Sequence, residues 1–422
     1  MVYAAGLDFG TSGARIVVID GSQAIVAQHS VAYLVTPNQD WSDRWLIALQ
    51  QLLQAIPVSL RVKLQALSIN GTSATVLLCD KEGVPLVAPL LYNDDAGKDY
   101  RCVLEGIAPM GSPVLSATSS LVKLLWWQAS LPTAVFQQAH YLMHQADWLA
   151  FHLHGQPGLS DYHNALKLGY DVGRLTYPDW LSRWKNLADL LPRIQAPGSA
   201  FGHVSPQACD RYGLSSDCSV IAGTTDSIAA FLASGAQAPG EAVTSLGSTL
   251  VLKLLSTTRV DDAQYGTYSH RLGDLWLVGG ASNTGGKVLR QFFTDEDLQR
   301  LSPKIRPYQP SGLTYYPLTQ PGERFPINDP TLSPQMEPRP REPEHFLYGL
   351  LEGMASIEAQ GYQCLQALGA TPLTHVFSAG GGARNATWTA IRQQHLSAPV
   401  TTAKTTEAAF GTACLAQASL RN

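Results

Sequence analysis

Residues 2–20 read VYAAGLDFGTSGARIVVID, two apolar runs joined by the short stretch DFGTSG at residues 8–13. Such runs, bounded by glycine and hydroxyl residues, predict two strands connected by a tight turn. Glycines let the backbone approach a ligand, and the turn N–H groups of Gly13 and its neighbours, with the hydroxyls of Thr11 and Ser12, suit the terminal phosphates of a nucleotide. The carboxylate of Asp8 would then lie where a phosphate-bound magnesium ion binds. The alternative is a β-hairpin turn without a ligand.

A second stretch of the same kind lies about half a chain further on. In SLGSTLVLK, at residues 245–253, Gly247, Ser248 and Thr249 again link two β-like runs. Two glycine and hydroxyl turns in one chain favour a duplicated fold that closes on a single nucleotide, and they weigh against the plain hairpin turn.

The stretch DFGTSG resembles the first phosphate motif of the sugar kinase, actin and heat-shock ATPase superfamily, and the chain resembles the FGGY carbohydrate kinases nearly from end to end. This resemblance implies an α/β fold of two actin-like (ribonuclease H-like) domains, each a mixed β-sheet flanked by helices, with an interdomain cleft. We expect an N-terminal domain at residues 1–232, with the sugar and the first phosphate motif, and a C-terminal domain at residues 233–422, with the second phosphate and adenosine motifs. The length of 422 residues agrees with two or three domains of about 150 residues each.

Composition narrows the class of partner. Charged residues make up 15% of the chain and the net charge is -4, so neither nucleic acid nor a membrane is an expected partner. No apolar run reaches the roughly 18 residues of a spanning helix. Six cysteines without a CxxC pair predict reduced thiols and a cytoplasmic protein, or a plastid stromal one if the chain is a processed precursor. We expect a monomer or homodimer that binds a small sugar and ATP.

A candidate catalytic base lies in VIAGTTDSIAAFLASGA at residues 220–236. The pattern predicts a strand, a turn with Asp226, and a helix of small residues. Asp226 at this place is either a helix N-cap or a functional carboxylate, and the residues alone leave both open. The resemblance to FGGY kinases implies that Asp226 contacts the sugar and is the catalytic base.

The sugar contacts are expected around ALSINGTSATVLLCD at residues 66–80, which reads as strand, turn and strand. In the FGGY family this turn touches the sugar, and xylulose kinases carry a Gln-Met-His-Gly type turn there. This chain has Gly-Thr-Ser-Ala at residues 71–74. We therefore expect Ser73 to contact the sugar together with Asp8 and Asp226, and the smaller turn favours D-ribulose over D-xylulose.

The nucleotide base is expected near THVFSAGGGARN at residues 374–385, which reads as strand, triple-glycine turn and helix start. The resemblance implies that Gly380, Gly381 and Asn385 contact adenosine, and that ATP and Mg²⁺ are the cofactors. A near match to a Walker P-loop begins at Gly280, but it fails because an extra glycine precedes Lys287 and a valine follows it.

Three further patterns carry weaker expectations. His140, His144 and Asp147 stand at i, i+4 and i+7, which on one helix would form a metal site or an ordinary helix face. Residues 301–345 hold eleven of the 26 prolines and predict an irregular connection. A long helix is predicted at residues 344–367, and a closing amphipathic helix is predicted with Thr405 or Thr406 as its cap.

The leading hypothesis is an ATP-dependent kinase that transfers the γ-phosphate to a hydroxyl of a ketopentose, D-ribulose ahead of the others. One alternative is a kinase of D-xylulose or another small sugar or polyol. Another is a non-catalytic ATPase switch with the same actin-like fold. Sugar-dependent release of ADP separates the kinases from the switch.

Overall fold

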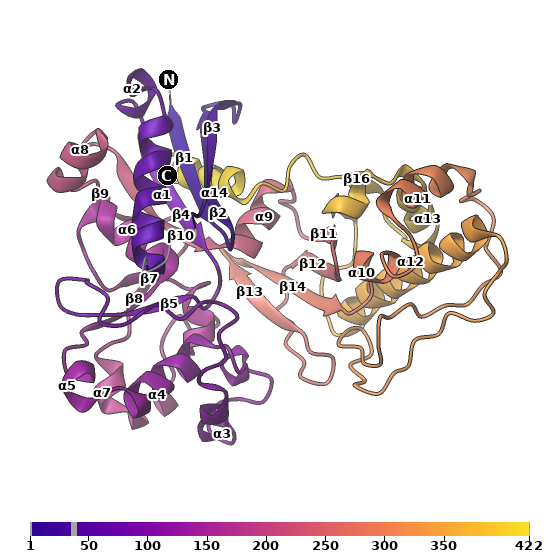
Figure 1. Cartoon of the computed structure of the whole chain (residues 1–422), viewed down its shortest axis with the longest axis horizontal. Coiled ribbons are helices and arrows are strands. Elements are labelled where there is room, and N and C mark those ends of the chain that lie inside the picture. Colours follow the sequence, from indigo (N-terminus) through magenta and orange to yellow (C-terminus); the bar gives the residue numbers. More distant parts are fainter. Residues whose placement is uncertain (1, 35–39, 422) are drawn as a thin grey trace. The chain divides into compact units, whose positions relative to one another are not determined.

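The computed structural model describes residues 2–34 and 40–421 of the chain. It divides into two compact units (Figure 1): unit 1 contains Met1–Ala233 and Glu407–Asn422, and unit 2 contains Ser234–Thr406. The closing segment, which the sequence-based division assigned to the second domain, therefore packs within unit 1.

Unit 1 is built on a six-stranded mixed sheet with the order β3-β2-β1-β4-β10-β9. Strands β1, β2 and β3 are antiparallel neighbours, β4 is parallel to both β1 and β10, and β9 is antiparallel to β10. The predicted opening hairpin is confirmed as β1 and β2. The strands are β1 Tyr3–Phe9, β2 Gly13–Asp20, β3 Ile25–Ala32, β4 Ala66–Gly71, β9 Ala200–His203 and β10 Ser219–Thr225.

The register of this sheet places three strand ends at one edge. Asp8 of β1 pairs with Asn70 of β4, and Asn70 pairs in turn with Thr224 of β10. All three strands are parallel, so the segments that follow them leave the sheet at the same edge.

Helices cover both faces of the sheet of unit 1 (Figure 1), and the main ones are α1 Trp41–Ala55, α6 Gln145–His154, α9 Asp226–Ala233 and α14 Ala408–Ala418. The core between the sheet, α1 and α6 contains Leu7, Leu49 and Trp148, all nearly inaccessible to solvent. A second apolar layer joins the sheet to α14.

Helix α14 lies unusually close to its neighbours. A methyl group on Gly6 would lie 2.1 Å from the backbone nitrogen of Ala413, and one on Gly411 would lie 1.9 Å from the carbonyl oxygen of Ala229. This close packing on β1 and α9 holds the closing segment in unit 1. The helix begins after Glu407, so the expected cap at Thr405 or Thr406 is wrong.

The remaining part of unit 1 packs around α4 Ser120–Ser130, which is buried over most of its length. Two small sheets join it, formed by β5 with β6 and by β7 with β8. Their bounds, with those of the short helices, are β5 Val76–Cys79, β6 Tyr141–His144, β7 Leu159–Asp161, β8 Arg193–Gln195, α2 Val58–Arg61, α3 Arg101–Leu104, α5 Thr133–Phe136, α7 Lys185–Ala188 and α8 Pro206–Tyr212; the short 3₁₀ turns are η1 Lys98–Tyr100, η2 Pro113–Leu115, η3 Ala165–Leu168 and η4 Asp179–Arg183.

Unit 2 repeats the same plan with the strand order β13-β14-β12-β11-β15-β16. Strands β11 and β12 form an antiparallel hairpin, β14 adds to β12, and β15 is parallel to β11. In unit 1 the hairpin is β1 and β2, β3 adds to β2, and β4 is parallel to β1. The duplication inferred from the two turns is thus present in the topology. The strands are β11 Glu241–Leu246, β12 Leu250–Ser256, β13 Tyr268–Leu272, β14 Leu275–Ser282, β15 His375–Ala379 and β16 Val400–Thr402.

The helices of unit 2 are α10 Gly286–Leu289, α11 Asp295–Leu301, α12 Pro343–Ala367 and α13 Ala386–His395, with 3₁₀ turns η5 Ser302–Lys304 and η6 Gly381–Arg384. The long helix predicted at residues 344–367 is confirmed as α12. A buried ion pair joins it to α13: the guanidinium of Arg392 donates to both carboxylate oxygens of Glu358 at 2.6 and 2.7 Å. Neither side chain is exposed.

The proline-rich stretch is an ordered, irregular connection fastened by one buried acid. The carboxylate of Glu323 accepts hydrogen bonds from the hydroxyl of Ser282 at 2.5 Å, the backbone nitrogen of Asn283 at 2.7 Å and the hydroxyl of Tyr316 at 3.1 Å. These bonds attach the connection to the end of β14. Within the two described ranges, every helix is too short or too polar to span a lipid bilayer.

Candidate functional site

Unit 1 gathers three of the expected sugar-site residues at the carboxyl edge of its parallel strands. Asp8 is the last residue but one of β1, Ser73 lies in the turn that follows β4, and Asp226 follows β10 directly. Asp8 is in register with Thr224 through Asn70 of β4, and neighbouring strands are about 4.8 Å apart, so the backbones at Asp8 and Thr224 are separated by about 10 Å. Asp226 lies two residues beyond Thr224. This spacing leaves room for a small ligand between the two carboxylates.

The turn between β1 and β2 is closed by its own backbone. The nitrogen of Gly10 donates to the carbonyl of Gly13 at 3.0 Å, and the nitrogen of Tyr33 donates to the carbonyl of Ser12 at 3.1 Å. The side chains of Thr11 and Ser12 are exposed. A methyl group on Gly13 would lie 2.5 Å from the carbonyl oxygen of Val31, so the chain requires glycine there.

Asp8 is a half-buried acid, and its Oδ1 has no hydrogen-bond partner among residues 2–34 and 40–421. Burial, together with the negative charges of Asp226 and Glu407, raises its pKa to about 7, and the positive charge of Arg15 opposes this effect. Arg15 itself is bound to Glu407 at 2.6 Å. A cation beside Asp8 would relieve these unfavourable charges, so the site fits Mg²⁺, which proteins hold through one or two carboxylates together with the phosphates of a substrate.

Asp226 is the first residue of α9, so the predicted strand and helix around it are confirmed; in place of the predicted turn, β10 runs to Thr225 and the helix begins at the next residue. Its side chain is half-buried, and its Oδ1 accepts a hydrogen bond from the nitrogen of Ser227 at 2.6 Å. This bond leaves lone pairs on the carboxylate for a further donor. The helix-terminal and the functional interpretations of Asp226 are therefore compatible.

The turn at residues 71–74 is held in place from beneath. The side chain of Gln145 accepts hydrogen bonds from the nitrogen of Thr72 at 3.0 Å and from its hydroxyl at 3.1 Å. Ala74 has a left-handed φ of 65°, and its carbonyl accepts a hydrogen bond from the buried ammonium of Lys123 at 2.7 Å. Ser73 is half-buried, whereas Thr72 and Ala74 are buried, which leaves the Ser73 hydroxyl as the polar side-chain group that the turn presents.

In unit 2 three glycine-containing segments meet at the turn between β11 and β12. The nitrogen of Gly286 donates to the carbonyl of Gly247 at 2.8 Å, and the nitrogen of Lys287 donates to the carbonyl of Ser248 at 3.1 Å. A methyl group on Gly380 would lie 2.9 Å from the carbonyl oxygen of Leu246. The structure therefore brings Gly247, Ser248 and Thr249 beside Gly380 and Gly381, at the carboxyl ends of β11 and β15.

Asn385 has a structural role in addition to the expected adenosine contact. Its Oδ1 accepts a hydrogen bond from the nitrogen of Trp388 at 3.1 Å and so caps α13, while its Nδ2 donates to the hydroxyl of Ser302 at 2.9 Å. Both polar ends of the side chain are thus engaged. The contact to adenosine stays a prediction.

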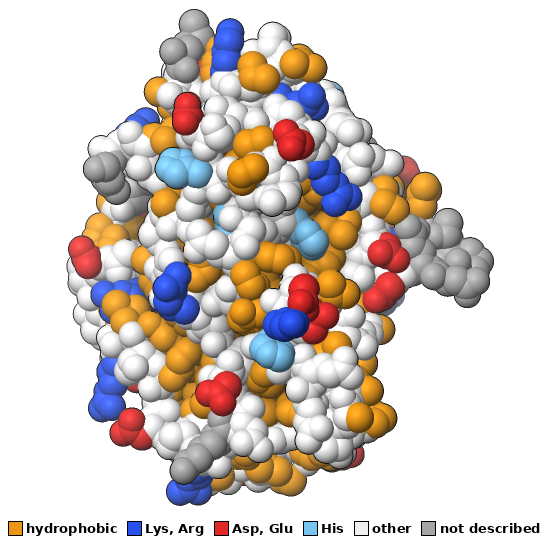
Figure 2. Space-filling model, turned by 90° about the vertical axis from the view of Figure 1, so that its left-hand side faces the viewer, with side chains coloured by type: hydrophobic (Ala, Val, Ile, Leu, Met, Phe, Trp, Pro, Cys, Tyr) orange, Lys and Arg blue, Asp and Glu red, His pale blue; other side chains and the backbone are white. Residues whose placement is uncertain are grey.

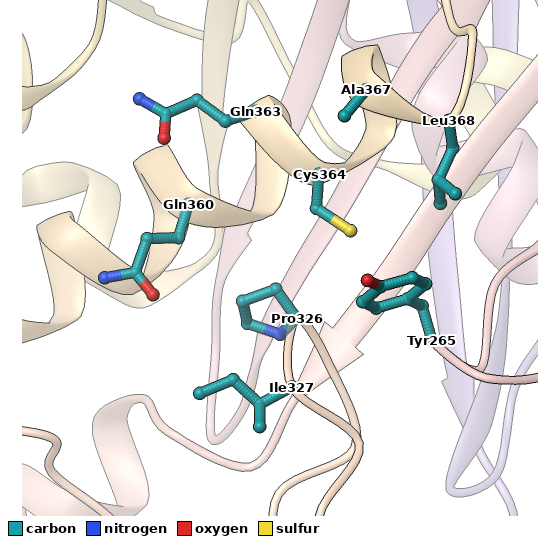
Figure 3. Close-up of a pocket in the computed structure, with 8 residues that line it drawn as sticks. All are labelled: Tyr265, Pro326, Ile327, Gln360, Gln363, Cys364, Ala367 and Leu368. Carbon is teal, nitrogen blue, oxygen red and sulfur yellow. The ribbon is translucent and has the colours of Figure 1, made fainter.

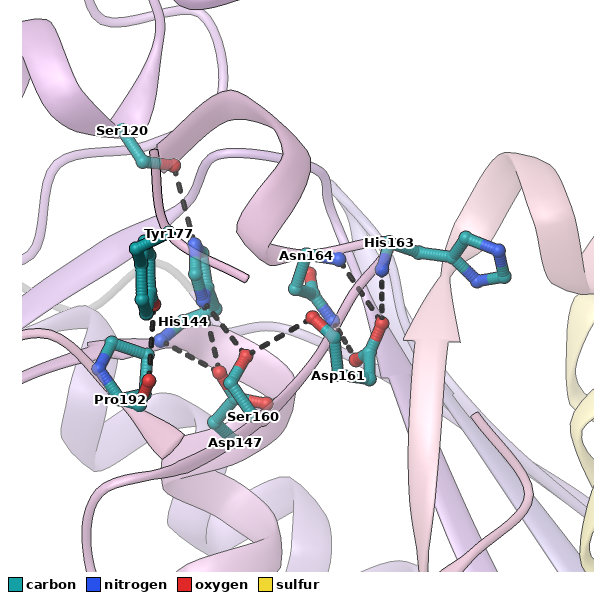
Figure 4. A network of polar contacts seen from close by, with 9 residues as sticks. All are labelled: Ser120, His144, Asp147, Ser160, Asp161, His163, Asn164, Tyr177 and Pro192. Atoms are coloured by element: carbon teal, nitrogen blue, oxygen red, sulfur yellow. Dashed lines mark hydrogen bonds and ion pairs between the residues drawn. The ribbon is translucent and has the colours of Figure 1, made fainter. Parts of the chain in front are cut away.

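The expected metal triad of His140, His144 and Asp147 is not formed on one helix. His140 precedes β6, His144 ends that strand, and α6 begins only at the next residue. His144 instead caps α6, with its Nδ1 2.9 Å from Asp147 Oδ2 (Figure 4). Across the described ranges, no group of three His, Cys, Asp or Glu side chains is arranged to hold a metal ion.

A buried acid next to this cap shapes the loop that leads toward Asp226. The carboxylate of Asp161 accepts hydrogen bonds from the backbone nitrogens of His163 at 2.8 Å and Asn164 at 3.0 Å, and from Nδ2 of Asn164 at 2.6 Å (Figure 4). Burial and the nearby charge of Asp147 raise the pKa of Asp161 to about 7. These bonds fix the start of the loop.

Sequence reasoning missed two groups beside the site. Lys167 is near enough to Asp226 that the carboxylate's charge acts on its pKa, and Glu407 acts on Asp8 from the far end of the chain. A lone lysine inside the apolar run ALKLGY was a signal for the first. Nothing local to residues 401–410 indicated the second, because the contact depends on the return of α14 to unit 1.

Other surface features lie outside these sites. A hollow of about 560 Å³ in unit 2 is lined by eight residues (Figure 3), and none of them was expected to bind sugar or nucleotide: Tyr265, Pro326, Ile327, Gln360, Gln363, Cys364, Ala367 and Leu368. On the face drawn in Figure 2, Lys and Arg side chains are dispersed among acidic and neutral ones. The six cysteines are free thiols.

Comparison with known proteins covers nearly the whole chain. The sequence profile of the N-terminal domain of the FGGY family of carbohydrate kinases matches residues 3–233, and that of the C-terminal domain matches residues 242–420. The xylulose kinase of Bacillus subtilis (strain 168) is 23% identical, over 92% of this chain and 82% of the relative. The gluconokinase of the same organism is 20% identical, over 98% of this chain and 86% of the relative.

Solved structures agree in fold. A ligand-bound xylulose kinase from Lactobacillus acidophilus has a TM-score of 0.84 at 19% identity, covering 100% of this chain and 90% of that structure. The Plasmodium falciparum glycerol kinase with ADP has a TM-score of 0.83 at 18% identity, again covering 100% and 90%. The expected α/β fold with two actin-like mixed sheets flanked by helices is confirmed.

Proposed function

The chain belongs to the FGGY family of carbohydrate kinases, and from that premise we propose that it transfers the γ-phosphate of ATP to a hydroxyl of a ketopentose, with D-ribulose as the favoured substrate. Kinases of this family use ATP with Mg²⁺. The observation that supports the proposal most directly is the edge of unit 1 at which Asp8 lies at the end of β1, while Ser73 and Asp226 follow the neighbouring parallel strands β4 and β10. A ligand at this edge would be reached by two carboxylates and one hydroxyl.

In the proposed reaction Asp226 accepts the proton of the attacking hydroxyl as the new O–P bond forms. A carboxylate that is ionised at neutral pH serves this role without a raised pKa, provided that it lies within hydrogen-bond reach of the hydroxyl. Its place at the start of α9 suits this, because the first turn of a helix stabilises a carboxylate. Ser73 would orient the sugar by a hydrogen bond.

Phosphate binding is assigned to the two glycine and hydroxyl turns. Thr11, Ser12 and Gly13 would bind phosphate oxygens from unit 1, and the turn that contains Gly247, Ser248 and Thr249 would do so from unit 2. Phosphoryl transfer depends mainly on positioning and on neutralising charge, and a bound Mg²⁺ supplies positive charge next to the transferred group.

Asp8 is proposed as the residue of unit 1 that holds the Mg²⁺, because a cation would bind its Oδ1, which has no hydrogen-bond partner among the described residues, and would offset the burial and negative charge that raise its pKa. Adenosine is assigned to the glycine turn before α13, with Gly380, Gly381 and Asn385. Residues 1–232 are proposed to bind the sugar and the first phosphate motif's ligand, and residues 233–422 are proposed to contain the second phosphate and adenosine motifs.

The preference for D-ribulose is argued from the turn at residues 71–74. The two ketopentoses differ at a single stereocentre, so small changes in the lining of the pocket decide between them. The hydroxyl of Thr72 is 2.6 Å from that of Thr75 and is also bound to Gln145, so it is not available to a ligand. Ser73 remains as a short, single hydroxyl, half-buried in the turn. D-xylulose is the second candidate because several relatives carry that name.

The test is a coupled assay of ADP release over a panel of ketopentoses, aldoses and polyols, with wild type, Asp226→Asn and Asp217→Asn. Asp217 is an exposed acid that precedes β10, at the opposite end of the strand from Asp226, and so it is a matched control. We expect Asp226→Asn to lower sugar-dependent turnover by about 10²- to 10⁴-fold, with ADP affinity changed by only a few fold.

The outcomes separate the candidates. A larger kcat/KM for D-ribulose than for D-xylulose supports the substrate proposed, and the reverse order replaces it with D-xylulose. Slow hydrolysis of ATP that no sugar accelerates would contradict the kinase and favour the ATPase switch. Retention of most turnover by Asp226→Asn would remove Asp226 from the mechanism.

A further inference from the structure

Five buried polar side chains of unit 2 form one hydrogen-bonded network, which we call the Arg392 network: Thr244, Glu358, Tyr362, Ser378 and Arg392. Besides its two bonds to Glu358, the guanidinium of Arg392 donates through Nη1 to the hydroxyl of Ser378 at 2.6 Å. The hydroxyl of Thr244 donates to Oε1 of Glu358 at 2.5 Å and lies 2.7 Å from the hydroxyl of Tyr362. No member is more than 3% exposed, so the fold alone fixes these contacts.

The ion pair at the centre of this network is a weak reason for its presence. Taking two charges out of water costs free energy that their attraction repays only in good geometry, and apolar residues of similar volume are often as stable in the same place. A fully bonded polar network differs from an apolar core in that it accepts one arrangement of the elements that carry it. The place of its members in the fold therefore matters more than their charge.

Two members of the network lie just before the two glycine turns of unit 2. Thr244 of β11 is three residues before Gly247, and Ser378 of β15 is two residues before Gly380. Thr244 and Ser378 are in register on these parallel strands. The turns above them are in close contact, because a methyl group on Gly380 would lie 2.9 Å from the carbonyl oxygen of Leu246. The network thus joins the two strands directly before the point at which their turns meet.

The other members bring two helices to the same point. Arg392 lies on α13, which Asn385 caps, and Glu358 and Tyr362 lie on α12. Arg392 therefore connects α13 to β15 through Ser378, and to β11 through Glu358. Each residue of unit 2 that is proposed to bind the nucleotide follows β11 or β15, or caps α13: Gly247, Ser248, Thr249, Gly380, Gly381 and Asn385.

We propose that the Arg392 network sets the spacing between the turn at residues 247–249, which would bind phosphate, and the turn at residues 380–381, which would bind adenosine. Its five members are then positioning residues for the nucleotide, and none of them touches ATP. The inference rests on the nucleotide contacts of the proposed function. One nucleotide has to meet both turns at once, and a binding site tolerates displacements of only about 0.5 Å, so a shift of β15 relative to β11 weakens binding.

The first test separates positioning from stability with the double variant Arg392→Met/Glu358→Leu. Its apolar side chains replace the ion pair at similar volume, so most of the stability should be kept. We expect its Kd for ADP in the presence of Mg²⁺, measured by titration calorimetry, to be about 5- to 20-fold higher than that of wild type, as for the loss of one or two hydrogen bonds to the nucleotide. KM for the sugar at saturating ATP should stay within about twofold of wild type.

A second test uses two tyrosines of α12. Tyr362→Phe removes the hydroxyl that contacts Thr244. Tyr348→Phe is the matched control, because the hydroxyl of Tyr348 donates to the carbonyl of Gln309 and the residue lies about 21 Å nearer the start of the helix. Each change removes one bonded hydroxyl, so the losses of stability should be similar. Tyr362→Phe should raise the Kd for ADP by about 2- to 5-fold, and Tyr348→Phe should leave it unchanged.

The outcomes decide the inference separately from the kinase. A double variant that is as stable as wild type and binds ADP with the wild-type Kd overturns the inference. If the double variant does not fold, the tyrosine pair decides, and an equal Kd for ADP in Tyr362→Phe and Tyr348→Phe overturns it. A rise in KM for the sugar as large as the rise in the Kd for ADP also overturns it, because that result indicates a general loosening. If wild type binds ADP but phosphorylates no sugar, the proposed function fails, and the same Kd values still decide the inference.

Discussion

Replacing Asp8 with asparagine should make the ligand-free protein more stable while removing its activity. Asp8 is half-buried, its Oδ1 has no hydrogen-bond partner in the part of the chain that the structure describes, and Asp226 and Glu407 add negative charge nearby. Asparagine has nearly the same shape and no charge. The substitution therefore relieves the cost of a buried carboxylate and, at the same time, takes away the group proposed to hold Mg²⁺.

The size of the effect follows from the pKa of Asp8, which rises from 3.8 to about 7 in the folded protein. Each unit of such a difference corresponds to about 1.4 kcal/mol, so the raised pKa of Asp8 lowers the stability by about 4 kcal/mol at pH 8 and about 1.5 kcal/mol at pH 5. Folded Asp8 keeps its proton between these pKa values, whereas the unfolded chain has lost it. Its contribution to stability therefore falls as the pH rises from about 4 to 7 and is constant above that.

The assay is urea unfolding of wild type, Asp8→Asn and Asp217→Asn at pH 5 and pH 8, without nucleotide and with a chelator. The advantage of Asp8→Asn over wild type should grow by about 2.5 kcal/mol between the two pH values, and Asp217→Asn should match wild type at both. Added MgADP should stabilise wild type more than Asp8→Asn. An Asp8→Asn protein that is less stable than wild type at pH 8, or whose advantage is the same at both pH values, would refute the reasoning.

Three further predictions concern other parts of the chain. Arg392→Met should destabilise unit 2 by about 3–5 kcal/mol because it leaves the buried Glu358 carboxylate without its positively charged partner. The double variant Arg392→Met/Glu358→Leu should recover most of that loss in denaturation experiments, and a double variant as unstable as the single one would contradict this. Burial lowers the pKa of His154 to about 4, so below pH 6.5 the unfolded chain takes up a proton that the folded protein does not. His154→Gln should therefore reduce the loss of stability between pH 7.5 and pH 5 by about 2 kcal/mol. Unfolding experiments at both pH values measure this difference. Ser73→Ala should raise KM for the sugar by about 5- to 10-fold, because one hydrogen bond to the sugar contributes about 1 kcal/mol to binding. Steady-state kinetics that show the same rise in KM for ATP would count against a sugar contact.

Short-range patterns predicted the elements that the sequence specifies locally. The opening hairpin, the strand and helix around Asp226, the helix α12 and the strand before Gly380 were all readable, because glycine turns and apolar periodicity act within a few residues. Local patterns also misled. Histidines at helical spacing suggested one helix face, but His144 completes the pairing of β6 with β5 and its side chain caps the helix that follows.

What could not be read from the sequence depends on contacts between distant segments. Glu407 acts on Asp8 only because α14 packs against β1, and that packing requires glycine at two positions in sequence-remote elements. Lys167 is near Asp226 because a loop after β7 is attached to β10 through His163. Neither relation has a period or a motif, since each arises from how segments far apart in the chain pack together.

The two units treat buried charge in opposite ways, and the difference bears on function. In unit 2 the buried Arg392 and Glu358 form an ion pair, Ser378 accepts a further hydrogen bond from Arg392, and Thr244 donates one to Glu358. At the carboxyl edge of unit 1, by contrast, Oδ1 of Asp8 has no hydrogen-bond partner among the described residues. A fold selected for stability alone has no reason to keep a half-buried carboxylate in that state. A cation relieves it, and a kinase that binds Mg²⁺ with its nucleotide supplies one.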